Sequence, residues 1–162
     1  MDILAVDVGG TKVDMAIVKD GTVVSRDRFL NSPSENIVNL IASYTKDRQI
    51  DGVGIGVAGQ VDYETGTVIF GGNLGWQNFP LGTLLAKELN VPVFVENDAN
   101  IFALGVWKYE LGGTAESVLG ITLGTGIGGG FVYEGELLRS KKGASLEIGH
   151  MVIEAEGPAC TC

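Results

Sequence analysis

A carboxylate, two glycines, a hydroxyl and an amine occur close together near the start of the chain, at Asp7, Gly9, Gly10, Thr11 and Lys12. Glycine lets the backbone approach a phosphate closely and aim several N–H groups at it. Asp7 could hold a magnesium ion directly or through water, and Thr11 or Lys12 could reach a phosphate oxygen. The segment predicts a phosphate-binding turn, although a hairpin whose glycines serve only the turn geometry also fits it.

A second glycine-rich turn spans residues 124–130 and begins with Gly124, Thr125 and Gly126. It contains the letters of the dinucleotide fingerprint, which requires a helix next because the pyrophosphate lies on the helix N-terminus. Residues 131–138 instead predict a strand and a tight turn. The segment therefore argues against an NAD enzyme and predicts a second phosphate turn.

The polar residues Glu96, Asn97 and Asp98 directly follow a predicted buried strand and stand where a helix is expected to begin. This position is the usual ligand edge of an α/β sheet. A carboxylate at a helix N-terminus is favoured in its ionised form, so Asp98 could accept the proton of an attacking hydroxyl as general base. A plain helix-capping role for Asp98 is the alternative.

The only two cysteines, Cys160 and Cys162, are separated by one residue at the end of the sequence. This spacing suits a metal-binding knuckle better than a disulfide framework.

The elements that must position these residues follow from the apolar periodicity. Strands are predicted at residues 3–8, 13–18, 23–29, 53–57 and 91–95, with a small ribbon at 61–70. Helices are predicted to begin at Ser32, with a capping box, and at Pro80, and to cover about 98–111. Hairpin-linked strands followed by alternating helix and strand indicate a mixed sheet covered by helices, hence an α/β fold.

The pattern restarts at Val118. Residues 3–9 align with 118–124, and the turn at 19–21 falls near 133–135. The sequence therefore predicts one full unit followed by the first hairpin of a second, with domains at 1–117 and 118–162.

Composition limits the possible partners. The chain has 162 residues, of which 45% are apolar, and this length allows one compact domain on the prior of ~100–200 residues per domain. A net charge of -9 argues against nucleic acid, whose phosphates attract clustered Lys and Arg. Any bound phosphate must be held by backbone N–H groups and a cation. The sequence has no membrane span and no basic leader, so we expect a cytoplasmic protein that binds no membrane.

Two related glycine turns, one at the start of each repeat, resemble the phosphate clamp of the actin, Hsp70 and hexokinase superfamily. Within that superfamily, the segment from Glu96 to Asn100 is similar to the catalytic segment of the ROK family (repressor, open reading frame, kinase). The resemblance implies a ribonuclease-H-like mixed sheet flanked by helices, plus the first hairpin of a second such unit. It also implies that the two turns face each other across an ATP-binding cleft.

The ROK resemblance implies roles for further residues. Asp98 would be the catalytic base, and Asn97 would bind the sugar. Glu147 and His150 match a sugar-binding segment, whereas Asn73 lies where the family has a sugar-facing loop and is also compatible with an ordinary turn. The sugar-contacting residues implied are Asn73, Asn97, Asp98, Glu147 and His150.

The resemblance also implies a structural zinc site. His150, Cys160 and Cys162 have the family's spacing, but a closed zinc site takes four ligands and the fourth is absent from this chain.

The implied activity is ATP- and Mg2+-dependent phosphorylation of a hexose, with glucose as the first candidate, in a homo-oligomer. The adenine-binding part of the second unit is missing, so we expect weak or no activity from these residues alone. One alternative is a sugar-sensing transcriptional regulator, whose helix-turn-helix would precede the first strand, where only Met1 and Asp2 stand. A non-catalytic sugar-binding module is another alternative.

Overall fold

The computed structural model describes residues 1–30, 36–140 and 143–157. The chain divides into two compact units, Met1–Asp98 and Ala99–Cys162. The predicted division into 1–117 and 118–162 stays a prediction, and the two units are described separately below.

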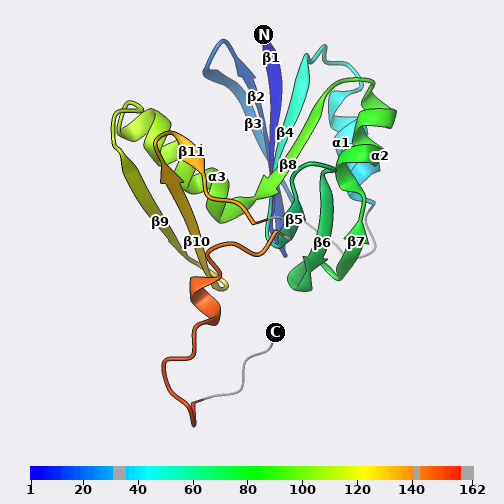
Figure 1. Ribbon diagram of the computed structural model, residues 1–162. Helices are drawn as coiled ribbons and strands as arrows, with labels where there is room; N and C mark the ends of the chain where they lie inside the picture. The colour runs from blue at the N-terminus through cyan, green and yellow to red at the C-terminus, as the bar shows by residue number, and fades with distance from the viewer. Residues whose placement is uncertain (31–35, 141–142, 158–162) are drawn as a thin grey trace. The chain divides into compact units, whose positions relative to one another are not determined.

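A five-stranded mixed sheet forms the centre of the first unit (Figure 1). Its strands are β1 (Asp2–Val8), β2 (Lys12–Lys19), β3 (Thr22–Leu30), β4 (Gly52–Val57) and β8 (Val93–Asn97), in the order β3-β2-β1-β4-β8. The first three strands are antiparallel neighbours, whereas β4 is parallel to β1 and β8 is parallel to β4. The α/β class and the mixed sheet predicted from the sequence are confirmed.

Two helices, α1 (Ile37–Thr45) and α2 (Leu81–Leu89), pack on one face of this sheet (Figure 1). Alternate residues of the strands point toward them, because successive side chains of a strand point to opposite faces. Leu4, Val53 and Ile55 are at most 1% exposed. The predicted helix start at Ser32 lies outside the described residues, and α1 is capped by Asn36, whose side chain accepts a hydrogen bond from the N–H of Val38.

A small antiparallel sheet extends the first unit beside α2. It contains β5 (Gln60–Asp62), β6 (Thr67–Gly71) and β7 (Trp76–Phe79), with the short 3-10 turn η1 (Gly72–Leu74) between the last two strands. Gly66 and Gly82 pack backbone to backbone, since a Cβ at Gly66 would lie 2.9 Å from Cα of Gly82. This close packing fixes the start of α2 against the small sheet.

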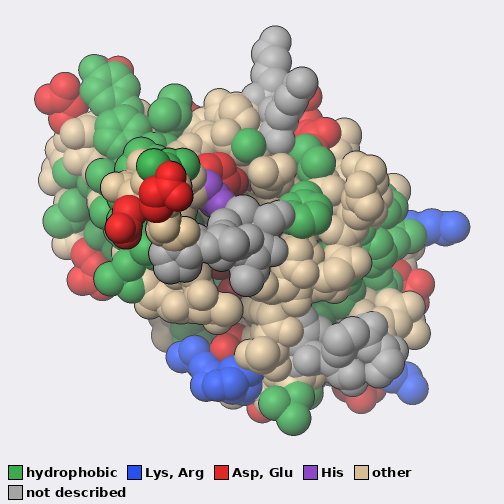
Figure 2. Space-filling model, turned by 90° about the horizontal axis from the view of Figure 1, so that it is seen from below, with side chains coloured by type: hydrophobic (Ala, Val, Ile, Leu, Met, Phe, Trp, Pro, Cys, Tyr) green, Lys and Arg blue, Asp and Glu red, His purple; other side chains and the backbone are tan. Residues whose placement is uncertain are grey.

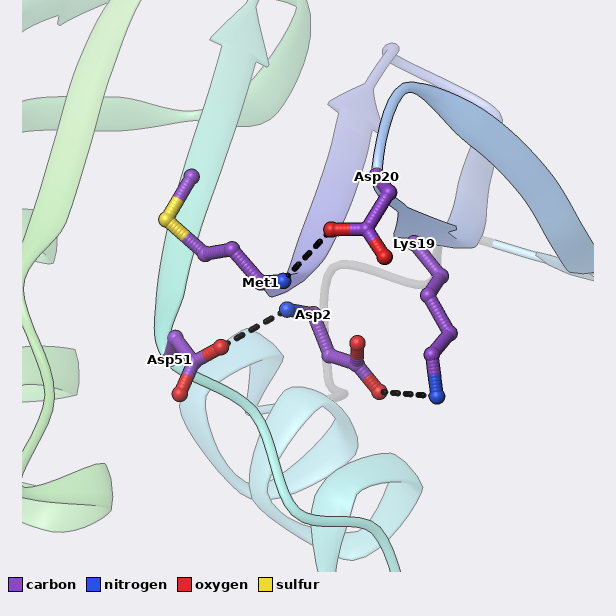
Figure 3. A network of polar contacts seen from close by, with 5 residues as sticks. All are labelled: Met1, Asp2, Lys19, Asp20 and Asp51. Carbon is purple, nitrogen blue, oxygen red and sulfur yellow. Dashed lines mark hydrogen bonds and ion pairs between the residues drawn. The ribbon is translucent and has the colours of Figure 1, made fainter.

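The far end of β1 is fixed by a polar network (Figure 3). The terminal ammonium of Met1 lies 2.8 Å from Asp20, and the N–H of Asp2 donates to Asp51 over 2.7 Å. Lys19 lies 3.9 Å from the Asp2 carboxylate. These contacts hold the end of β1 that is remote from the glycine turn.

The second unit is a three-stranded sheet packed on a helix. Helix α3 (Asp98–Gly105) begins at the unit boundary and continues as the π-helical turn η2 (Val106–Glu110). The strands β9 (Ser117–Leu123), β10 (Ile127–Tyr133) and β11 (Glu136–Leu137) follow, then the 3-10 turn η3 (Ile148–His150). The second glycine turn is confined to residues 124–126, because β10 already begins at Ile127, inside the stretch 124–130 that was predicted to be a turn. The β9–β10 hairpin is antiparallel, like the β1–β2 hairpin.

Glycines allow α3 to pack closely on the β9–β10 hairpin. A Cβ at Gly120 would lie 2.8 Å from the Cβ of Ala103, and one at Gly128 would lie 2.9 Å from the Cβ of Ala99. Part of the glycine-rich stretch therefore serves helix packing. Among the described residues, no helix is long and apolar enough to cross a membrane.

Candidate functional site

The turn between β1 and β2 presents backbone N–H groups. The N–H of Gly9 donates to the carbonyl of Lys12 over 2.9 Å and closes the turn. Within the described ranges, no protein group accepts a hydrogen bond from the N–H of Gly10 or Thr11. Thr11 and Lys12 are exposed. The turn can therefore present two N–H groups, a hydroxyl and an ammonium to an anion, which is the composition of a phosphate-binding loop.

Asp7 lies beside a second carboxylate on the neighbouring strand. Asp7 pairs with Asp14 in the β1–β2 register, and Asp14 pairs with Arg28 on β3. The pKa of Asp7 is raised, first by partial desolvation and then by the negative charge of Asp14, against the lowering effect of Arg26 and Arg28. A cation beside Asp7 would relieve this repulsion.

Asn73 touches the predicted phosphate turn. It lies in η1, and a Cβ at Gly10 would be 3.0 Å from the Cβ and 3.3 Å from the carbonyl oxygen of Asn73. The side chain of Asn73 is exposed and has no hydrogen-bond partner among the residues that the structure describes. The structure therefore brings the predicted sugar-facing loop into contact with the predicted phosphate turn.

Asn97 and Asp98 lie at the carboxyl end of β8, next to the end of β4. The register pairs Asn97 with Val57, and the Asn97 amide donates from Nδ2 to the carbonyl of Gly59 over 3.0 Å. Asp98 is exposed and lies in the first turn of α3. This hydrogen bond connects the end of β8, which carries Asn97 and Asp98, to the loop that follows β4.

Gly59 was missed by the sequence analysis. A Cβ there would lie 2.5 Å from the carbonyl oxygen of Phe70 and 3.0 Å from Cα of Gly71. Gly59 thereby links the end of β6 to Asn97. The available signal was a glycine two residues after a buried strand, which can mark a close backbone approach.

The second unit carries the remaining described site residues. In its turn, the N–H of Gly124 donates to the carbonyl of Gly126 over 2.9 Å, and residues 124–126 are exposed. In η3, Nε2 of His150 lies 3.6 Å from a carboxylate oxygen of Glu147. His150, the only histidine in the chain, is exposed (purple in Figure 2). That the two glycine turns face each other stays a prediction.

The structure divides the predicted site residues between the units. The first unit holds Asp7, Gly9, Gly10, Thr11, Lys12, Asn73, Asn97 and Asp98, and the second holds Gly124, Thr125, Gly126, Glu147 and His150. Cys160 and Cys162 lie outside the described residues, so the zinc site stays a prediction. Within the described ranges there is no group of three or more metal-ligating side chains.

A separate groove of about 720 Å³ lies at the opposite edge of the first unit's sheet. It is lined by the carboxyl ends of α1 and α2 and by the segments that lead into β4 and β8, including Lys46, Arg48 and Glu88. Because β4 and β8 are parallel, their amino ends are remote from Asn97. The groove is therefore distinct from the candidate site.

Comparisons with known proteins point to one family. The family model described as ROK family matches residues 3–162. A glucokinase of Thermotoga maritima is 39% identical over 171 residues, which cover 100% of this chain and 54% of that protein. A xylose repressor of Caldicellulosiruptor bescii is 36% identical over 111 residues, 68% of this chain and 28% of the repressor.

A solved structure has a similar fold. It is a ROK family glucokinase from Streptomyces griseus in complex with glucose and AMPPNP, with 35% identity and a TM-score of 0.87. The alignment covers 97% of this chain and 52% of that glucokinase. The chain thus spans about half the length of the glucokinases it matches.

Proposed function

Because this chain belongs to the ROK family, we propose that it contributes the phosphate turn and the catalytic carboxylate of an ATP-dependent kinase that phosphorylates a hexose hydroxyl. Glucose is the first candidate substrate, since the similar proteins from Thermotoga maritima and Streptomyces griseus are glucokinases. The complete activity is a proposal for the full-length gene product.

A continuous series of contacts at the carboxyl edge of the sheet supports this proposal. The Asn97 amide is bonded to Gly59, and Gly59 packs on Gly71, the residue before η1. In η1, Asn73 in turn packs on Gly10 of the phosphate turn. The proposed sugar-binding residues of this unit and the proposed phosphate-binding donors therefore form one connected surface.

These residues can perform phosphoryl transfer mainly by positioning and electrostatics. The N–H groups of Gly10 and Thr11 would hold phosphate oxygens, and Asn73 and Asn97 would orient the sugar. The oxygen of the sugar hydroxyl would form a bond to the terminal phosphorus of ATP, and Asp98 would accept the proton that this hydroxyl releases. The bond between that phosphorus and the bridging oxygen breaks, and ADP leaves with its electron pair.

Two metals belong to the proposal. Magnesium, bound near Asp7, would neutralise charge on the phosphates. His150, Cys160 and Cys162 would hold structural zinc, and a fourth ligand would complete the closed site.

The test is an assay of the full-length gene product with ATP, Mg2+ and a panel of hexoses and N-acetylhexosamines. We expect ADP release that depends on one sugar, with glucose giving the highest kcat/KM. Sugar binding in calorimetry without any ADP release would instead identify a non-catalytic sugar-binding module.

The similarity to a xylose repressor supports a second candidate, a sugar-responsive regulator. The net charge of -9 in this chain disfavours DNA binding by these residues. Retention of the full-length protein on promoter DNA at physiological salt, reversed by a sugar, would favour this candidate over the kinase.

A further inference from the structure

The contact between Gly10 and Asn73 has a consequence for substrate binding. We propose that Gly10 is a positioning residue for Asn73, so that the backbone of the phosphate turn sets where the Asn73 amide meets the sugar. The proposal rests on the proposed sugar kinase function. It assigns to Gly10 an effect on sugar affinity that is separate from any contact with phosphate.

The Cα of Gly10 lies next to the Cβ of Asn73, which is the first atom of that side chain. The nearest neighbours of a Cβ at Gly10 would all belong to Asn73: its Cβ at 3.0 Å, its carbonyl oxygen at 3.3 Å and its carbonyl carbon at 3.8 Å. Carbon atoms prefer separations of ~3.5–4.0 Å. A methyl group at Gly10 would therefore push on the atom that carries the Asn73 amide.

Packing of its neighbours restrains the loop that carries Asn73. Leu74 is only 9% exposed, and Gly75 has a φ of +67° in the left-handed region. A Cβ at Gly71 would already lie 3.3 Å from the Leu74 side chain. Both sides of Asn73 are thus held by packing, and a push from Gly10 would move the exposed Asn73 side chain.

The neighbouring glycine of the turn behaves differently. A Cβ at Gly9 would meet only the carbonyl oxygen of Lys12, at 3.3 Å, and would not approach η1. Gly10 is therefore the position of the turn through which the phosphate-binding and sugar-binding residues of the first unit are in contact.

The experiment measures glucose affinity of the full-length protein without nucleotide, so that phosphate contacts cannot contribute. Calorimetry is performed on wild type, Gly10→Ala, Asn73→Ala and the double variant. Because a displaced amide would leave a hydrogen bond to the sugar unmade, we expect Gly10→Ala to weaken glucose binding about 5- to 50-fold. In the Asn73→Ala background, Gly10→Ala should weaken glucose binding less than about 2-fold, because no amide remains to be displaced.

Gly54→Ala is the matched control. Gly54 lies in β4 outside the proposed site, and a Cβ there would have nothing within 4 Å. We expect its glucose affinity to equal that of wild type. An unchanged affinity in Gly10→Ala, or an equal loss in both backgrounds, would overturn the proposal.

A second measurement on wild-type protein covers the case in which Gly10→Ala does not fold. Amide hydrogen exchange of Gly10 should slow when glucose is added without nucleotide, because the sugar would hold Asn73 against the turn. An exchange rate that does not change at saturating glucose would overturn the positioning role. Absence of any glucose binding by wild type would instead refute the proposed function itself.

Discussion

Asn97 donates a hydrogen bond from its side-chain Nδ2 to the backbone carbonyl of Gly59, over 3.0 Å. The bond is part-buried and joins the last residue of β8 to the loop after β4. It holds in place the residue directly before Asp98. The proposed catalytic carboxylate therefore extends from a backbone that is fixed on its amino-terminal side.

Replacing Asp98 with Asn should separate sugar binding from turnover. The amide keeps the size of the side chain but cannot accept the proton of the sugar hydroxyl. General-base catalysis contributes roughly 10²- to 10⁴-fold, so kcat should fall by about that factor. The glucose Kd should remain within about 3-fold of wild type, because hydrogen-bonding capacity at this position is largely retained. Stopped assays and calorimetry on the full-length protein measure the two quantities.

Asp47→Asn is the matched control for this substitution. Asp47 is exposed and has no ion-pair partner among the described residues. Its kcat should equal that of wild type. Full turnover in Asp98→Asn would remove Asp98 from the proposed mechanism.

Local sequence patterns predicted the hairpins, the mixed sheet and the carboxyl edge that carries Asn97. These features depend on apolar periodicity and on turn residues that lie within a few positions of one another. The contact of Gly10 with Asn73 and the bond of Asn97 to Gly59 join residues far apart in the sequence. No local pattern encodes such contacts, because they depend on how β4, β6 and β8 pack together.

The pairing of Asp14 with Arg28 should make stability depend on pH. Arg28 donates from Nε to both carboxylate oxygens of Asp14, over 2.9 and 3.1 Å, and holds the pKa of Asp14 below its usual range. Ionised Asp14 therefore adds stability above its pKa in the unfolded chain, and this contribution is lost as the pH falls through its folded-state pKa. Arg28→Gln should lower Tm at pH 7, and the deficit should shrink in acid. The deficit should be small, because solvent screens an exposed pair.

Arg26→Gln is the comparison variant, since Arg26 lies farther from Asp14, at 3.6 Å. Its loss of Tm at pH 7 should be smaller than that of Arg28→Gln. Thermal unfolding of both variants and wild type across the acidic range tests this ordering. An Arg28→Gln deficit that stays constant with pH would show that the ion pair is not its cause.

A methyl group at Gly120 should destabilise the second unit. Its Cβ would lie 2.8 Å from the Cβ of Ala103, which is fully buried in α3. Overpacking of this kind costs about 1–3 kcal/mol, so Gly120→Ala should lower the unfolding free energy by that amount. Gly124→Ala in the same hairpin meets nothing within 4 Å and should leave the unfolding free energy nearly unchanged. Equal denaturant midpoints for the two variants would contradict the close packing of α3 on β9.

His150→Ala should remove zinc and weaken sugar binding together, if His150 serves both ligands as the ROK resemblance implies. Nε2 of His150 faces the Glu147 carboxylate at 3.6 Å. The ROK resemblance assigns Glu147 to the sugar and not to the metal. Glu147→Gln should therefore weaken glucose binding while leaving zinc retention near that of wild type.

Metal analysis of the full-length protein after dialysis against a weak chelator distinguishes these variants. Wild type and Glu147→Gln should retain zinc, whereas His150→Ala should retain none. Glucose calorimetry on the same samples should show weaker binding by His150→Ala, even when zinc is added back. Undiminished zinc in His150→Ala would exclude the imidazole as a ligand, because Cys160 and Cys162 would then hold the metal without it.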